Sequence, residues 1–546
     1  MTRQQFEELK AEARELHGRT VTFRRAIHEH PELSFAEHET ARYVSGQLAA
    51  EGISFRPIAG TGILAKIEGR GDLSRCVVLR ADMDALPIRE QTGLPFASRN
   101  EGVMHACGHD MHTACLLGAL ILLNRRRSEI DGTVFGLFQP GEEVDPGGAS
   151  LVLAEDPFRD YRVQAVVGEH VGAEIPLGQL GFRPGKYMAS GDEVRITVRG
   201  RGGHGALPHN LNDPVVAAAA LITALQQVVS RNIDSRVPSV LSFGRVIADG
   251  ATNILPSEVR LEGTFRTMDE VWRAEGKRRI REISAGVAAA YGVEADVDIA
   301  DGYPCVVNDP ELTRRAQRIA AEMWGDERII PLDLRMTAED FGYYTERYPS
   351  LFFRLGTAGP DGTSGGGLHT GTFNPGEEAL DQVSARACFG YHLFHLRMAL
   401  QIIFQTVCYI LSLWNHSYAI RKILHNAAHK KRIMRATQNN GINISVLQHQ
   451  LVDAFLYEII SSRTICFIGF HDGSPKRTSH ATHLNLWPKF RNFHIITLAF
   501  NSTFCSQKSH VITLGNSTNY FGSRADNTQN SSAGIQLRNI ALLQRT

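Results

Sequence analysis

Hydrophobic residues along the first part of the chain alternate between helical and strand spacing. Apolar residues that recur every three or four positions predict helices over residues 5–29, 37–51 and 111–127. Short β-branched runs bounded by Gly and Asp predict strands over 62–67, 76–80, 133–139 and 164–168. Strands that alternate with helices in this way predict an α/β domain, with a mainly parallel sheet covered by helices on both faces. Ligand sites in such sheets gather at the carboxyl ends of the strands.

The pattern changes near Lys186, where a second set of elements begins. It predicts two helices, over 213–231 and 270–290, and strands over 193–199, 239–246, 258–267 and 294–299. The order β-α-β-β-α-β is that of a ferredoxin-like α+β domain. Helix and strand elements resume after Gly302. We therefore predict a catalytic domain in two parts, 1–185 and 302–396, with a satellite domain, 186–301, inserted between them.

Charge separates the end of the chain from the rest. The whole chain has 58 Lys and Arg and 58 Asp and Glu, but residues 399–546 contain 15 basic and 4 acidic residues. This segment also lacks a sustained hydrophobic period. We interpret residues 397–546 as an extension of unknown role with a poorly ordered or non-native sequence, and a chain truncated at Arg397 would test this. The alternative is a weak basic tether for nucleic acid or anionic membrane around residues 430–435.

Composition also bears on where the protein works. The apolar run 399–414 is shorter than the roughly 20 residues that span a bilayer, and it indicates an interfacial or aggregation-prone helix. The chain opens directly into a charged helical pattern, and its 8 Cys have no regular spacing. We therefore expect a cytoplasmic protein with reduced thiols and no signal peptide, and neither a nucleic acid nor a membrane as partner.

Side chains that bind metals follow several predicted strands. Cys107 and His109 lie two positions apart before an apolar helix, and Gly108 between them permits a tight turn. The adjacent Glu142 and Glu143 also follow a strand, where one could bind a metal and the other act as a base. Further donors at strand ends or in loops are Asp84, His170 and His369. Each alone is typical of a solvated loop or a structural histidine, but together they predict a metal site with a base beside it.

Longer motifs around these donors resemble those of the M20 metallopeptidase family. They are Leu79-Arg-Ala-Asp-Met-Asp-Ala-Leu-Pro87, Gly102-Val-Met-His-Ala-Cys-Gly-His-Asp110, Phe138-Gln-Pro-Gly-Glu-Glu143, Gly200-Arg-Gly-Gly-His-Gly-Ala-Leu-Pro-His209 and Ala338-Glu-Asp-Phe341. The motifs are most similar to those of the amidohydrolase branch, which includes hippurate hydrolases, N-acyl-amino-acid amidohydrolases and auxin-conjugate hydrolases. The resemblance runs from about residue 5 to about residue 395.

The resemblance implies a zinc-exopeptidase-like catalytic domain with two divalent metal ions per subunit. The residues that match the family's metal ligands are Cys107, His109, Glu143, His170 and His369. Glu142 matches its general base, and Asp84 matches a carboxylate that orients a ligand. The implied reaction is metal-assisted amide hydrolysis, in which Glu142 takes a proton from the attacking water and delivers it to the leaving nitrogen. A Cys ligand favours Zn²⁺, while Mn²⁺, Co²⁺ and Ni²⁺ remain open.

Three residues of the satellite domain complete the implied site. The resemblance makes His204 the group that stabilises the tetrahedral oxyanion, commonly from a partner subunit. Asn253 and Arg266 are candidates to hold the substrate, because Arg suits the bidentate geometry of a carboxylate. The alternative for Asn253 is a turn residue before Pro256, and the alternative for Arg266 is a surface charge. His28 and His30 also match a family motif, and we interpret them as structural.

We therefore expect a metal-dependent hydrolase that cleaves the amide bond of N-acyl amino acids with acetyl or aromatic acyl groups. We also expect a homodimer or homotetramer formed through the satellite domain. A dipeptidase or an N-acetyl-diaminopimelate-type deacetylase is the alternative within the family, and a non-catalytic metal-binding relative is the alternative outside the enzyme class. Loops form the pocket walls, so the sequence leaves the preferred acyl group and amino acid open.

Overall fold

The computed structural model describes residues 3–362, 364–382, 495–498 and 512–515. The chain divides into two units, one up to Leu411 and one from Ser412, and each is described by itself. The described part of the second unit is an antiparallel pair of strands, β17 (Ile495–Leu498) and β18 (Ile512–Gly515). The apolar run at 399–414 and the basic run at 430–435 lie outside the described residues.

The larger part of the first unit is built on an eight-stranded sheet of order β1-β2-β4-β3-β5-β16-β6-β15. The central strands β4, β3, β5 and β16 run parallel to one another, and β2 and β6 flank them antiparallel. The predicted α/β sheet is therefore confirmed, and its parallel part is the centre. The strands are β1 (Ser54–Ile58), β2 (Gly62–Glu68), β3 (Arg75–Asp82), β4 (Thr133–Gln139), β5 (Arg162–Pro176), β6 (Leu180–Phe182), β15 (Ile329–Pro331) and β16 (Ser350–Ala358).

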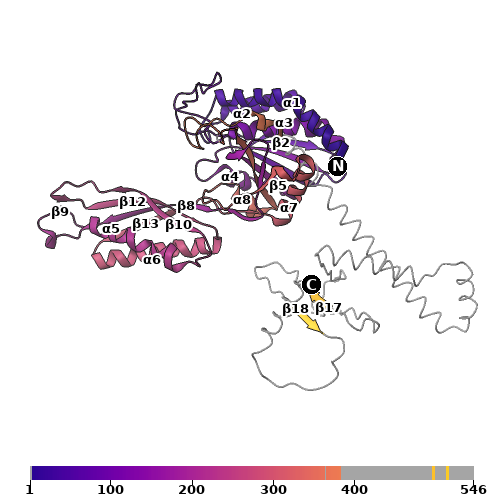
Figure 1. Cartoon of the computed structure of the whole chain (residues 1–546). Helices are drawn as coiled ribbons and strands as arrows, with labels where there is room; N and C mark the ends of the chain where they lie inside the picture. The colour runs from indigo at the N-terminus through magenta and orange to yellow at the C-terminus, as the bar shows by residue number, and fades with distance from the viewer. Residues whose placement is uncertain (1–2, 363, 383–494, 499–511, 516–546) are drawn as a thin grey trace, which may run out of the picture. The chain divides into compact units, whose positions relative to one another are not determined.

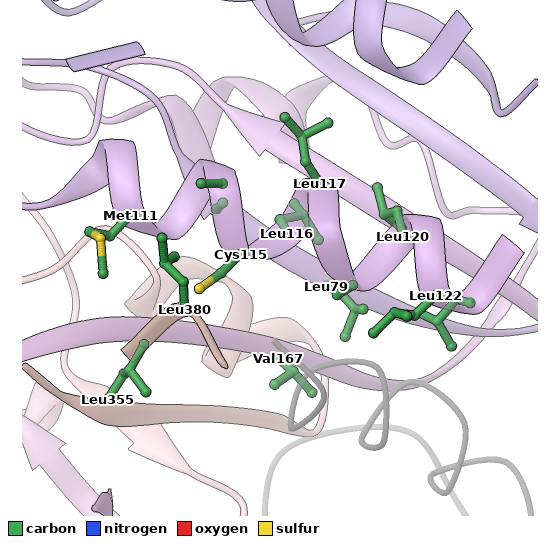
Figure 2. Packing of buried hydrophobic residues seen from close by; sticks show 14 of the residues in the cluster. Leu79, Met111, Cys115, Leu116, Leu117, Leu120, Leu122, Val167, Leu355 and Leu380 are labelled. Atoms are coloured by element: carbon green, nitrogen blue, oxygen red, sulfur yellow. The ribbon is translucent and has the colours of Figure 1, made fainter. Parts of the chain in front are cut away.

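Helices cover both faces of this sheet (Figure 1). One face carries α1 (Arg3–Glu29), α2 (His38–Ala50), α3 (His109–Arg125) and α7 (Pro310–Trp324), and the other carries α4 (Gly148–Ala154) and α8 (Gly342–Arg347). α3 is buried along nearly its whole length because α1 packs against it, which explains why it is apolar on most sides. Figure 2 shows Cys115 and other α3 side chains packed in one cluster with Leu79, Val167 and Leu355 of the sheet.

The inserted domain is a four-stranded antiparallel sheet of order β10-β12-β8-β13 with α5 and α6 on one face (Figure 1). The chain order and the strand order are those of a ferredoxin-like domain, as predicted. Its elements are β8 (Ser190–Arg199), α5 (Pro214–Leu225), β10 (Ser239–Ile247), β12 (Glu258–Thr267), α6 (Glu270–Tyr291) and β13 (Glu294–Ala300). The short strands β7 (Gly185–Met188) and β14 (Val306–Asn308) pair where the chain enters and leaves this domain.

Two strands run further than their apolar patterns predicted, and both extensions carry site residues. β3 continues to Asp82, and β5 continues through His170 to Pro176. Backbone pairing explains both, because β3 stays hydrogen-bonded to β4 up to Gln139 and β5 follows β16 up to Ala358. His170 therefore lies within a strand, rather than after the end of one as the sequence predicted.

Candidate metal centre and active site

The amino-terminal turn of α3 presents two of the predicted metal ligands. His109 is the first residue of α3, and Cys107 directly precedes Gly108, which caps the helix with φ +94°. A Cβ at Gly108 would lie 2.6 Å from Cγ2 of Val171, so glycine is required for this loop to approach β5 so closely. The glycine thereby places both donors against the strand that carries His170.

The five predicted donors converge at this turn. Sγ of Cys107 lies 3.4 Å from Nε2 of His170 and 3.4 Å from Nε2 of His369. Oε1 of Glu143 lies 3.4 Å from Nε2 of His369 and 3.9 Å from Nε2 of His109. The donors form two overlapping groups of three, and Cys107 is common to both. The arrangement therefore offers two neighbouring metal positions that could share the sulfur.

The donor atoms of this cluster fit divalent cations. Nε2 of His109 and Oε1 of Glu143 are buried and have no hydrogen-bond partner among the described residues. Unpaired buried polar atoms are costly, and a cation would satisfy both. A thiolate, three imidazoles and a carboxylate suit Zn²⁺ and related ions. Burial, together with the charge of Glu143, raises the pKa of the Cys107 thiol, so we expect metal binding to release a proton.

His369 approaches the cluster from a strained loop. Its φ of +63° is uncommon for a residue with a side chain, and the surrounding structure must hold it. The amide of His369 donates to the carbonyl oxygen of Ala106 at 2.9 Å, which joins this loop to the one that carries Cys107. The His369 side chain is 53% exposed, whereas Cys107, His109 and His170 are buried. The site is therefore most open to solvent on the His369 side.

Asp84, predicted to orient a ligand, contacts two of the donors. Its Oδ1 lies 3.2 Å from Nδ1 of His109, which leaves Nε2 of that ring for the cluster. Its Oδ2 accepts hydrogen bonds from the amide of Glu143 at 3.0 Å and from Oγ of Ser34 at 2.6 Å. One buried carboxylate thus fixes both the ring of His109 and the backbone of Glu143.

Glu142 lies beside the donors and also faces a group of acids. Its carboxylate lies within 4.8 Å of those of Glu339 and Asp340. Burial, followed by the charges of Glu339, Glu143 and Asp340, raises the pKa of Glu142 well above its usual range. The hydroxyl of Tyr303 donates to the carbonyl oxygen of Glu142 at 2.5 Å and holds its backbone. The two adjacent glutamates can therefore divide their work, with Glu143 as a ligand and Glu142 as a proton acceptor.

The sequence patterns did not predict the buried charge network next to this base. Nη2 of Arg80 lies 2.6 Å from Oδ1 of Asp340 and 3.0 Å from Oε1 of Glu339, while its Nη1 donates to Oδ2 of Asp82 at 2.6 Å. Asp340 also accepts from Nε2 of Gln139 at 2.7 Å. The signal available in the sequence was Arg80 and Asp82, two charged residues at the end of the apolar strand β3.

His204 and Asn253 lie together in the satellite domain. β9 (Gly203–His204) pairs antiparallel with β11 (Ile254–Leu255), which directly follows Asn253. The amide of Ala206 donates to Nδ1 of His204 at 3.1 Å, so a neutral His204 carries its proton on Nε2 and can donate it from an exposed position. Within the described part of the chain, His204 belongs to none of the groups of possible metal donors.

Arg266, on β12, lies beside the start of the acidic pair. A Cβ at Gly191 would lie 2.8 Å from Cβ of Ala338 and 3.4 Å from Nη1 of Arg266, so the missing side chain leaves room for both. Ala338 directly precedes Glu339. Arg266 is half-buried, and the ion pairs of the described residues do not include it. A half-buried guanidinium of this kind is suited to an incoming carboxylate.

Comparison with known proteins supports a metal-dependent amide hydrolase. Residues 78–384 match the model of the peptidase family M20/M25/M40. An N-acetylcysteine deacetylase of Bacillus subtilis is 40% identical over 370 residues, which are 67% of this chain and 94% of that protein. A second deacetylase of the same organism, acting on N-acetyl-L-cysteine, is 39% identical over 63% of this chain and 82% of its own. A dinuclear metal-binding M20 peptidase of Bacillus subtilis has a TM-score of 0.60 at 36% identity, over 69% of this chain and 98% of its own.

Proposed function

This chain belongs to the peptidase family M20/M25/M40, and we propose that it removes the acyl group from N-acyl amino acids. It is a hydrolase that acts on amide bonds. The observation that carries the proposal is the convergence of five metal donors with the buried carboxylate of Glu142 beside His109 and Glu143. The two deacetylases of Bacillus subtilis support an N-acetyl amino acid as substrate.

The proposed reaction divides the work between Glu142 and the donors. Bound divalent ions would supply a Lewis acid for the amide carbonyl and lower the pKa of a bound water. Glu142 accepts a proton from the attacking water and returns it to the leaving nitrogen. The acids Glu339 and Asp340 favour this proton uptake because they raise the pKa of Glu142. Tyr303 and Asp84 hold the two ends of the peptide group that joins Glu142 to Glu143.

The substrate carboxylate is proposed to bind Arg266. A guanidinium without an ion pair in the described structure, next to the loop that carries Glu339, can pair with that carboxylate once the substrate enters. A dipeptide or an N-acyl-diaminopimelate would present a carboxylate as well, so both remain alternative substrates. A panel of N-acetyl and N-benzoyl amino acids, dipeptides and N-acetyl-diaminopimelate separates these possibilities, and metal analysis separates Zn²⁺ from Mn²⁺, Co²⁺ and Ni²⁺.

We further propose that two copies associate through the satellite domain. The segment Pro214–Asn232, which contains α5, is long and apolar enough to span a membrane by length and composition, yet only 33% of its apolar window is buried. Val216 on α5 and Val246 on β10 are 51% and 54% exposed. β10 is also an edge strand of its sheet. A second copy could cover this helix face and this edge, and could supply His204 to the partner's site.

Replacing the base tests the proposed chemistry directly. We expect Glu142→Gln to lower kcat by about 10²- to 10⁴-fold, because it removes the proton acceptor. The variant should keep the metal content of the wild type, because the five donors are unchanged. Steady-state kinetics with N-acetyl amino acids and elemental analysis measure the two effects, and Glu101→Gln, an exposed acid, is the control. A Glu142→Gln enzyme with near-normal kcat would contradict the assignment.

A further inference from the structure

We propose that His112 is a positioning residue that fixes the metal ligand His170, and that it does not itself bind metal. This inference rests on the proposed metal centre. His112 lies one turn into α3, and its ring lies beside those of two ligands, His109 and His170. The ring centroids of His112 and His170 are 4.7 Å apart, and those of His112 and His109 are 5.4 Å apart. All three side chains are buried.

Hydrogen bonds determine which nitrogen of His112 carries the proton. The backbone amide of Val171 lies 2.9 Å from Nε2 of His112, and an amide can only donate, so Nε2 must be the acceptor. The proton of the neutral ring is therefore on Nδ1, which donates to Oδ1 of Asp82 at 2.6 Å. Both nitrogens are engaged. His112 consequently has no lone pair to offer a cation, although Asp82, His109 and His112 are close enough together to suggest another metal group.

Val171, whose amide bonds to His112, also sets the orientation of His170 through its carbonyl oxygen. The carbonyl oxygen of Val171 accepts from Nδ1 of His170 at 2.8 Å and from Nη1 of Arg354 at 3.1 Å. The bond to Nδ1 leaves Nε2 of His170 to face the donor cluster, 3.4 Å from Sγ of Cys107. His112 thus holds the amide end of Val171 while His170 bonds to its carbonyl end. A shift of Val171 would turn the His170 ring away from Cys107.

On the side away from Val171, His112 bonds to Asp82, which is held in the core. Oδ2 of Asp82 accepts from Nη1 of Arg80 at 2.6 Å, and its backbone carbonyl accepts from Oγ1 of Thr113 at 2.8 Å. Arg80 and Asp82 are fully buried. His112 therefore connects a rigid ion pair to the strand that carries the ligand, and residues that orient a metal-bound histidine commonly contribute about 10- to 100-fold to metal affinity.

Two substitutions separate the two bonds of His112. His112→Asn places an amide nitrogen near the position of Nδ1, so it can keep the bond to Asp82 but leaves Val171 without an acceptor. His112→Gln places an oxygen near the position of Nε2 and can keep the bond to Val171. We expect His112→Asn to bind one of its two metal ions about 10- to 100-fold more weakly than the wild type, and His112→Gln to lose less. Competition with a chelator for Zn²⁺, with CD spectra to verify folding, measures both.

The control is His28→Asn, which replaces another buried, hydrogen-bonded histidine that contacts Asp110 and Glu90 instead of β5. It should change stability and leave Zn²⁺ affinity unchanged. A folded His112→Asn protein with wild-type affinity for both ions would overturn the proposal. So would unfolding of both His112 variants, because His112 would then be required for the fold itself. A wild-type protein that binds no Zn²⁺, Mn²⁺, Co²⁺ or Ni²⁺ would instead refute the proposed function.

Discussion

A single carboxylate, that of Asp84, orients two ligands of the proposed metal centre. It bonds to the ring of His109 through one oxygen and to the amide of Glu143 through the other, so two ligands of the proposed centre depend on it. Hydrogen bonds from both, and from Ser34, lower the pKa of Asp84 although burial opposes this, and Asp84 therefore stays ionised. An ionised acceptor is what both partners require, because each presents an N–H group.

We expect Asp84→Asn to weaken metal binding by about 10- to 100-fold and to lower kcat/KM. The amide has a single oxygen acceptor, so one of the two bonds must be lost whichever way it is oriented. Ser34→Ala is the matched control, because it removes only the third hydrogen bond to the same carboxylate. Titration with Zn²⁺ measures the difference, and equal affinities in the two variants would show that Asp84 does not orient the ligands.

Between elements, the contact of α1 with α3 is held by charge as well as by apolar packing. Asp110, in the first turn of α3, accepts from Nε of Arg24 at 2.8 Å and bonds to Nδ1 of His28 at 2.8 Å. All three side chains are fully buried. This arrangement accounts for His28, which matches a family motif, without assigning it a chemical role. The network joins α1 to α3 and contributes to the stability of the fold.

We expect Asp110→Asn to lower the free energy of unfolding by about 1.5–3 kcal/mol, because it removes one of the two carboxylates that pair with the buried Arg24 and leaves only Glu377, at 3.0 Å from Nη1. Glu39→Gln, which breaks the exposed pair of Glu39 with Arg42 on α2, should cost no more than about 1 kcal/mol. Urea unfolding followed by CD compares the two. Similar losses for both variants would contradict a structural role for the buried network.

On the scale of the whole molecule, the proposed role of His204 requires two domains, because the metal donors lie in the catalytic domain and His204 lies in the satellite domain. Its bonds are to other satellite residues, while the donors belong to the catalytic elements. The exposed apolar face of α5 and the edge strand β10 provide a surface through which two copies could meet. The same insertion that gives the protein its second domain would then also give it its oligomeric state.

Mixed dimers test this arrangement. We expect Glu142→Gln and His204→Ala to be nearly inactive separately and to recover about a quarter of the wild-type activity per subunit after subunit exchange. In a mixed dimer, one site combines the intact Glu142 of one chain with the intact His204 of the other. Mass spectrometry of isotope-labelled subunits would verify exchange. Verified exchange without recovery would show that His204 does not act in the partner's site.

The sequence by itself determined the elements and the donors, because both depend on local order. Hydrophobic period gave the α/β sheet and the βαββαβ insertion, and the short motifs around Cys107, Glu142 and His369 marked the donors. Only the tertiary structure decided what each donor faces. The bond of His112 to Val171 and the ion pair of Arg80 with Asp340, residues far apart in the sequence, depend on the packing of strands against helices. Such contacts cannot be read from a local sequence pattern, because they form only when distant segments are buried against each other.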